Sequence, residues 1–272
     1  MQMLKKALAA SPIGQKALTF REHRELKRLA SSASEQTGQK VNDLTSRRLR
    51  DALCEDGKTF VDVGAHIGSV IGGVMHASRP GKIIAIEAMP EKIADLRGNF
   101  PDAQIVHCAV GDSEGEVEFT VDVAASGYSS LDPAVRDRAA DFYILKVWMR
   151  RLDDVLPHEG IDVMKIDIEG AELGALRGAD KVVAGSRPVI VFESGVHDMQ
   201  GFPKAELFQW FADHDYDVVA PIRVAHDAPA MTLDVFLDAH QYPRLTQDFF
   251  GIPKERRIEI RDRARAILGI NA

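Results

Sequence analysis

A glycine turn between two short apolar runs constrains the fold of this chain more than any other feature. The first run ends at Asp62, and Gly64 and Gly68 then stand four residues apart before a helical pattern begins. The second run, residues 82–87, ends in the carboxylate of Glu87. This order predicts a buried strand, a tight turn into a helix, and a second strand parallel to the first. Such a turn lets the backbone approach a ligand and presents unpaired N–H groups at the helix N-terminus.

Alternating strand and helix patterns run through most of the chain. Because short apolar runs alternate with helical spacing, we predict the α/β fold class, with a doubly wound, mostly parallel sheet. An antiparallel last strand is expected at 247–253, and a charged helix at 254–269 follows it. The other expected strands are 59–63, 82–87, 104–108, 161–167, 188–193 and 216–220, and the expected helices are 68–78, 90–98, 170–183 and 203–213.

Three regions depart from this alternation. Residues 1–55 carry two helical patterns, and we expect them to form an N-terminal helical cap on a domain of residues 56–272. A substrate lid or a dimer arm is the alternative. Insertions are expected near 113–150 and 221–246. We expect residues 147–152 of the first insertion to pair back with a strand at 116–121. The insertion either covers the open side of a site or only connects scaffold elements.

Composition narrows the class of protein. The 272 residues are 45% hydrophobic, which suits one large globular domain, and the net charge of −7 argues against a general binder of nucleic acid or anionic membranes. No apolar run approaches the roughly 20 residues of a membrane span, and the N-terminus lacks the apolar segment of about 7–15 residues that export requires. We therefore expect a cytoplasmic protein. Cys54 and Cys108, without a CxxC motif, predict neither a disulfide framework nor a zinc site.

Carboxylates follow four of the predicted strands, at Asp62, Glu87, Asp167 and Glu193. The carboxyl ends of parallel strands meet at one edge of a sheet, where such folds bind ligands. Glu87 is placed to accept hydrogen bonds from both hydroxyls of a ribose, which predicts a nucleoside cofactor. A dinucleotide fingerprint needs a third glycine where His66 stands, and Asp62 would repel a pyrophosphate. A cationic ligand such as S-adenosylmethionine fits better, with NAD-dependent oxidoreduction as the alternative.

At this point a resemblance becomes specific. Five segments resemble, in order and spacing, the FkbM family of S-adenosylmethionine-dependent methyltransferases: residues 61–68, 86–91, 109–112, 152–155 and the Lys-x-Asp-x-Glu-Gly-x-Glu run at 165–172. Residues 187–193 and 249–253 look like the closing motifs of that family. The resemblance covers about residues 57–255 and implies the class I methyltransferase (Rossmann-like) fold and O-methylation of hydroxyls on sugars, polyketides and related molecules. The chain departs from the family pattern at His66, where Asn is frequent, and at Ala88-Met89-Pro90, where Glu-Pro is common.

The strand ends and the glycine turn supply the predicted site. We expect the cofactor to be held by Asp62, Gly64, Ala65, His66, Gly68, Glu87, Ala88, Ala109, Val110, Asp112 and Asp167. A hydroxyl that receives a methyl group must lose its proton, and the candidate catalytic residues for accepting it are Asp167, Glu169, Glu193 and His197.

Individual roles follow from position. Ala109 and Val110 are expected to line the adenine, whereas Asp112 either reaches the adenine amino group or only forms a turn. Glu172 is assigned to the N-terminal end of a helix, and Lys165, inside an apolar strand, to a buried pair with a carboxylate. We predict no metal, because the histidines show no ligand spacing. A magnesium ion held by Asp167, Glu169 and Glu193 is the alternative.

The acceptor is less constrained by the sequence. We expect a small-molecule or glycan acceptor, no nucleic-acid partner and no membrane span, and we leave open a homodimer, N-methylation and a non-catalytic protein that keeps the fold. Basic residues gather in and beside the first insertion: Arg136, Arg138, Lys146, Arg150 and Arg151. They either attract an acidic substrate or form a solvated face, and we favour the solvated face.

Overall fold

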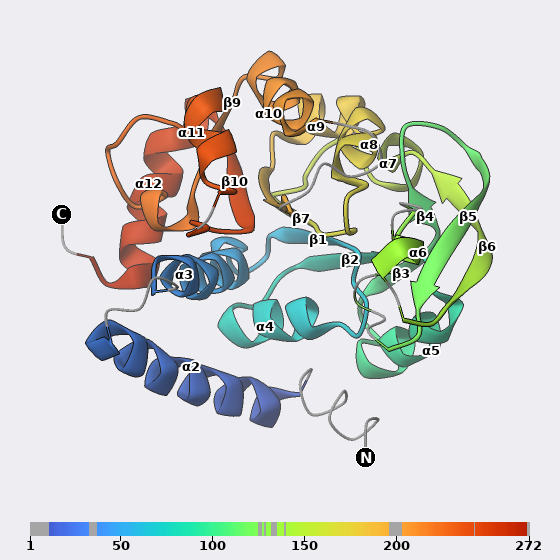
Figure 1. Ribbon diagram of the computed structural model, residues 1–272, viewed down its shortest axis with the longest axis horizontal. Helices are drawn as coiled ribbons and strands as arrows, with labels where there is room; N and C mark the ends of the chain where they lie inside the picture. Colours follow the sequence, from blue (N-terminus) through green and yellow to red (C-terminus); the bar gives the residue numbers. More distant parts are fainter. Residues whose placement is uncertain are drawn as a thin grey trace.

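A seven-stranded sheet forms the centre of the molecule, with helices on both faces (Figure 1). The computed structural model describes residues 11–32, 37–124, 127, 129–131, 135–138, 140–195, 203–241 and 243–270. The strand order is β3-β2-β1-β7-β8-β10-β9. The strands are β1 (Thr59–Val63), β2 (Lys82–Glu87), β3 (Gln104–His107), β7 (Val163–Ile166), β8 (Val189–Glu193), β9 (Tyr216–Val219) and β10 (Asp248–Pro253).

The pairing of these strands confirms the predicted fold. β1 runs parallel to β2 and β7, β2 to β3, and β7 to β8, whereas β10 lies antiparallel between β8 and β9. The chain therefore has a doubly wound, mostly parallel sheet whose last strand is inserted antiparallel. This is the class I methyltransferase arrangement that the resemblance implies.

The helices form two layers because alternate residues of each strand face opposite sides. Val61 and Val63 of β1 join the cluster that faces α8 to α11, whereas Phe60 joins the cluster with α3, α4, α5 and α12. The helices are α2 (Pro12–Ser32), α3 (Thr37–Leu53), α4 (Ser69–Ala77), α5 (Pro90–Asn99), α6 (Val135–Arg138), α7 (Leu152–Val155), α8 (Glu172–Arg177), α9 (Asp180–Ser186), α10 (Lys204–Asp213), α11 (Leu233–Asp238) and α12 (Arg257–Leu268). Among the described residues, no helix has the length and apolar character needed to cross a membrane.

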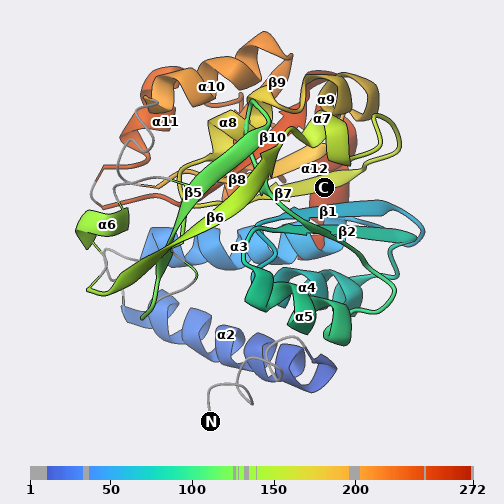
Figure 2. The same cartoon turned by 90° about the vertical axis from the view of Figure 1, so that its right-hand side faces the viewer.

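The two N-terminal helices differ in their surroundings. α3 packs beside α4 and α12 and contacts β7 and β10 of the sheet, so it belongs to one of the two helical layers. α2 lies outside this layer and contacts α3 and α4 (Figures 1 and 2). The sheet is therefore covered by α3, and α2 is the outermost element on that side.

The first insertion forms a second, smaller sheet of order β4-β6-β5. β4 (Ala109–Val110) runs parallel to the end of β6 (Phe142–Arg150), and β5 (Gly115–Asp122) runs antiparallel to β6 over its whole length. The expected return pairing of the insertion is confirmed, and β6 begins earlier than the sequence predicts. Figure 2 shows this twisted pair of strands standing in front of the ends of the central strands.

The predicted helix at 170–183 is wrong, because the structure divides it into α8 and α9. Gly178 ends α8 and lies so close to the carbonyl oxygen of Gly111 that a Cβ there would come within 2.2 Å. The carboxylate of Asp153 then accepts hydrogen bonds from the N–H groups of Lys181 and Val182, at 3.0 Å each, and gives α9 its own N-terminal cap. Asp153 is distant in sequence, so local helical spacing does not reveal this break.

Candidate active site

The glycine turn after β1 packs too tightly for side chains. The N–H groups of Gly64 and Ala65 both donate to the carbonyl oxygen of Ile86, at 3.0 Å, which ties the turn to β2. Gly64 has a φ of 86°, and a Cβ there would lie 2.0 Å from the carbonyl oxygen of Asp167. At Gly68 a Cβ would meet the ring of Phe100 at 2.2 Å. Both positions therefore require glycine, and the turn lies directly beside the residue that follows β7.

Glu87 organises the backbone at the end of β2. Its carboxylate accepts hydrogen bonds from the N–H of His66 at 2.7 Å and from the N–H of Met89 at 2.8 Å. Burial raises the pKa of Glu87, while these N–H donors act to lower it. An ionised carboxylate offers about four lone-pair sites, so two accepted bonds leave capacity for ligand hydroxyls.

A cavity of about 550 Å³, counting the part open to solvent, lies at the carboxyl ends of β1, β2 and β7. The predicted residues that line it are Gly64, His66, Glu87, Ala88, Ala109, Val110, Asp167 and Glu169. The structure thus brings together the turn, the end of β2 and the segment after β7, as expected for strand ends that meet at one edge of the sheet.

Other predicted site residues lie outside the cavity lining. Ala65 is buried and Gly68 is the N-cap residue of α4, so both belong to the turn itself. Asp112 is exposed, and Glu193 reaches Asp167 rather than the cavity wall. His197 lies outside the described residues.

Four lining residues come from the first insertion and were not predicted: Phe119, Gly127, Ser129 and Leu131. Phe119 is buried with Val121 and Val147 in a small cluster that also contains Ala109. The alternation along β5 predicts that Val117, Phe119 and Val121 share a face, but it does not say which ligand or element that face meets. The insertion therefore contributes one wall of the cavity.

Two residues that line the cavity hold unusual backbone conformations. His66 has a φ of 47° and Glu169 a φ of 54°, in the left-handed region that side chains rarely adopt. Such conformations cost about 1–3 kcal/mol each and cluster at functional sites. His66 follows the glycine turn and Glu169 follows β7, so the strain lies on both sides of the cavity.

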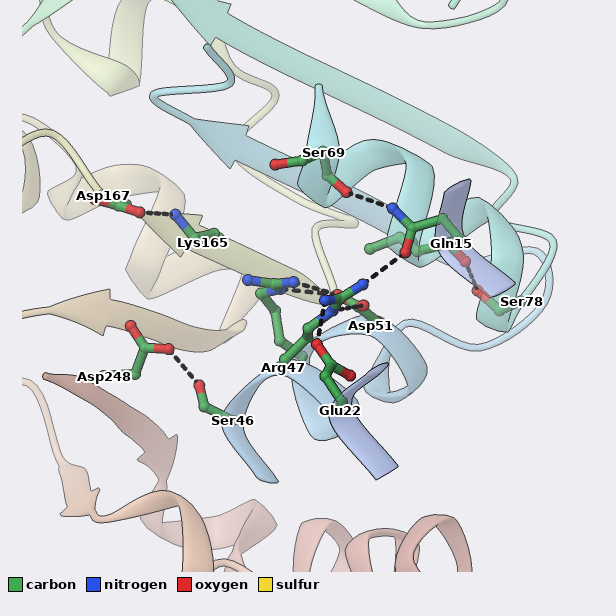
Figure 3. Close-up of polar contacts among 12 residues, drawn as sticks. Gln15, Glu22, Ser46, Arg47, Asp51, Ser69, Ser78, Lys165, Asp167 and Asp248 are labelled. Atoms are coloured by element: carbon green, nitrogen blue, oxygen red, sulfur yellow. Dashed lines mark hydrogen bonds and ion pairs between the residues drawn. The ribbon is translucent and has the colours of Figure 1, made fainter. Parts of the chain in front are cut away.

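A buried ion pair supports the segment after β7. The Nζ of Lys165 lies 2.5 Å from a carboxylate oxygen of Asp167, and Lys165 is buried, which confirms the expected pairing of this lysine (Figure 3). Burial alone would raise the pKa of Asp167, but the Lys165 ammonium and a hydrogen bond from Glu193 hold it below its usual range. Asp167 is therefore ionised.

Glu193 holds a proton beside Asp167. Burial and the hydrogen bond to Asp167 raise the pKa of Glu193 to about 11. The two carboxyl groups consequently share one proton, which resides on Glu193. One carboxylate oxygen each of Asp167, Glu169 and Glu193 lie within 4.8 Å of one another, close enough for the three groups to contact a single ion.

Glu172 and Asp62 are buried carboxyl groups beside the segment that follows β7. Glu172 accepts hydrogen bonds from the N–H groups of Ile168 and Gly170, at 3.1 Å each, and burial raises its pKa to about 7. Asp62 is fully buried, and its carboxylate oxygens have no hydrogen-bond partner among the described residues. Burial raises the pKa of Asp62 to about 6, against the opposing charges of Lys165 and Arg50. Asp62 therefore lies within the charge cluster rather than in the cavity.

Comparison with known proteins identifies the domain. A family model described as the methyltransferase FkbM domain matches residues 62–218, which is more than half of the chain. The chain belongs to the FkbM methyltransferase family. Every described residue that lines the cavity falls within this FkbM domain, whereas Arg50 precedes it and β10 and α12 follow it.

Individual relatives of the FkbM domain are distant. Methyltransferase sdnD of Sordaria araneosa is 26% identical over 156 residues, which are 45% of this chain and 60% of that protein. Methyltransferase FkbM from Methylobacillus flagellatus KT has 18% identity and a TM-score of 0.45, over 72% of this chain and 44% of that chain. A TehB-like SAM-dependent methyltransferase from Corynebacterium glutamicum has 13% identity and a TM-score of 0.39, over 87% and 97% of the two chains. The chain thus spans less than two thirds of the first two relatives.

Proposed function

We propose that this chain is an S-adenosylmethionine-dependent O-methyltransferase that acts on a hydroxyl of a small molecule or a sugar. The observation that carries the proposal is the charge of the cavity. Glu87, Asp167 and Glu169 line it, and no lysine or arginine is among its described lining residues. A cationic cofactor is attracted by such walls, whereas the pyrophosphate of a dinucleotide is repelled.

The residues present fit S-adenosylmethionine part by part. Ala109, Val110, Met89 and Phe119 offer apolar walls for a purine. We assign the ribose hydroxyls to Glu87, whose carboxylate is fixed by two backbone N–H groups. The bound cofactor supplies an activated methyl group on a sulfonium sulfur. The protein then has to bind, to orient the acceptor and to take its proton.

We assign the proton of the acceptor hydroxyl to the carboxylates that follow β7. Asp167 is ionised and lines the cavity, so its oxygen is able to accept a hydrogen bond from the hydroxyl and then its proton. Glu193 already carries a proton, so it acts as a donor that fixes Asp167. Glu169 is the second carboxylate on the same wall. This assignment makes Asp167 the base and Glu193 its positioning residue.

Calorimetry with S-adenosylhomocysteine tests the cofactor half of the proposal. We expect one site per chain and no binding of NADH. Glu87→Gln is expected to weaken binding about 10- to 100-fold, since hydrogen bonds to a charged group contribute about 1.5–3 kcal/mol. Glu91→Gln, on the exposed surface of α5, is the matched control and is expected to bind normally. Binding of NADH in place of S-adenosylhomocysteine would overturn the proposal.

Turnover tests the acceptor half. A screen of sugars and other hydroxyl compounds with methyl-labelled cofactor is expected to give label transfer, with S-adenosylhomocysteine released only when an acceptor is present. Asp167→Asn is expected to lose turnover and to keep most cofactor affinity. Wild-type turnover in this variant would assign the proton to another group, and label found on nitrogen alone would refute O-methylation.

A further inference from the structure

Helix α2 separates its acidic residues from its basic ones. It carries two acidic residues, Glu22 and Glu25, and both turn toward α3. Glu22 pairs with Arg47, and the Oε2 of Glu25 lies 3.7 Å from the Nζ of Lys40. Figure 3 shows Glu22 and Gln15 of α2 meeting Arg47. The acidic side chains of this helix are therefore used in attaching it to the rest of the protein.

The outer face of α2 is basic and apolar. Its five basic residues are all exposed: Lys16, Arg21, Arg24, Lys27 and Arg28. Two large hydrophobic side chains stand among them, Ile13 with 74% and Phe20 with 66% of its surface exposed. These two are seven residues apart, about two helical turns, so they share one side of the helix. Among the labelled elements, α2 lies at the edge of the molecule in both views, on the side of α3 and α4 away from the sheet (Figures 1 and 2).

We propose that this outer face of α2 docks the protein on an anionic lipid surface. A helix that lies in a lipid interface combines exposed apolar side chains with lysine and arginine around them. Ile13 and Phe20 enter the boundary between headgroups and acyl chains, while the five cations meet the lipid phosphates. The first eight residues contain Met1, Leu4, Lys5, Lys6 and Leu8 and so have the same mixture of types.

The exposed residues of α2 favour an anionic lipid surface over a second copy of the chain or a nucleic acid. A second copy of the chain, docked through the same face, would place five cations against five. A nucleic acid would satisfy the cations but would leave Ile13 and Phe20 without an apolar environment. The whole chain has a net charge of −7, so an anionic surface repels most of the molecule and attracts this helix. Docking is therefore directed to one face.

Flotation of the full chain with vesicles tests the proposal. We expect binding to vesicles of phosphatidylcholine mixed with phosphatidylglycerol, weak binding to phosphatidylcholine alone, and loss of binding as salt rises. Arg24→Gln combined with Lys27→Gln is expected to weaken partition about 25-fold, since each cation near the surface contributes about fivefold. Phe20→Ser is expected to weaken it about tenfold or more.

Matched controls lie elsewhere on the surface. Ile258→Ser on α12 removes an isoleucine that is 66% exposed, and Lys82→Gln removes an exposed cation at the start of β2. Both variants are expected to bind vesicles as the wild type does. The proposal is overturned if the wild type ignores anionic vesicles, or if the α2 variants bind as tightly as the controls. Salt-sensitive binding to RNA without vesicle binding also overturns it, and assigns the face to nucleic acid.

Discussion

The proton on Glu193 makes the stability of the protein depend on pH in a way that one substitution removes. Burial and the bond to Asp167 raise the pKa of Glu193 from 4.5 to about 11. Between these two values the folded chain holds a proton here that the unfolded chain releases, so stability falls as pH rises. The stability that this proton contributes is fully present below the pKa of Glu193 in the unfolded chain, and it is lost as pH rises through the pKa of Glu193 in the folded protein. Glu193→Gln keeps a neutral hydrogen-bond donor beside Asp167 but does not titrate.

The magnitude follows from the proton difference. One proton more in the folded state changes the unfolding free energy by about 1.4 kcal/mol per pH unit. From pH 6 to pH 8 this gives an upper limit of about 2.7 kcal/mol, which we discount because Glu193 is partly exposed and solvent screens its interaction with Asp167. We expect the wild type to lose about 1–2 kcal/mol more than Glu193→Gln over this range. The raised pKa values of Asp62 and Glu172 also make stability depend on pH. They do so equally in the wild type and in Glu193→Gln, so their effect cancels in the difference between the two.

Urea denaturation at pH 6, 7 and 8, followed by circular dichroism, measures this difference. Glu206→Gln, an exposed glutamate that pairs with Arg177, is the control and is expected to keep the wild-type slope. Equal slopes for Glu193→Gln and the wild type would refute the reasoning, since they would mean that Glu193 is ionised in the folded protein. A change in urea m-value between the variants would instead show an altered denatured state, so m-values are compared first.

Three further substitutions probe separate features. Lys165→Met removes the cation that acts most strongly on the carboxylates of Asp167 and Asp62, so we expect a loss of up to about 3–5 kcal/mol of unfolding free energy at pH 8 in denaturant titrations. Adding Asp167→Asn is expected to recover part of this loss. Gly64→Ala places a methyl group against the Asp167 carbonyl, and we expect calorimetry to show at least tenfold weaker S-adenosylhomocysteine binding together with a lower Tm. Asp153→Ala removes the cap of α9, and we expect a loss of about 1–2 kcal/mol of stability with unchanged S-adenosylhomocysteine affinity.

The strands and the donor half of the site could be predicted because their signals are local. Most of the central strands are short apolar runs bounded by glycine, proline or a charged residue, and the carboxyl ends of the parallel strands mark one edge of the sheet. The position of Glu87 and the need for glycine at 64 follow from the same pattern. These local signals are enough to predict this half of the site, because the carboxyl ends of parallel strands always lie at the same edge of a sheet.

The orientation of the carboxylates could not be predicted, because it depends on tertiary contacts. Alternation along β1 places Asp62 on the side of Phe60, but only the packed structure shows that α3 and Arg50 lie there. The proton on Glu193 depends on the neighbouring position of β7 and β8, which brings Asp167 beside it. Phe119 lines the cavity because of the way the insertion folds, and the spacing of residues in the sequence does not predict that fold.

The charges beneath the cavity show that α3 takes part in the electrostatics of the site although it precedes the matched FkbM domain. Asp62 is fully buried and Asp167 is partly buried, and among the described residues the short hydrogen bond from Lys165 goes to Asp167. Arg50 supplies the second cation that lowers the pKa of both carboxyl groups. Asp62 and Asp167 facing Lys165 without Arg50 would leave an uncompensated charge, which a protein interior tolerates poorly. A domain cut at the family boundary would therefore lose a charge on which the cavity wall depends.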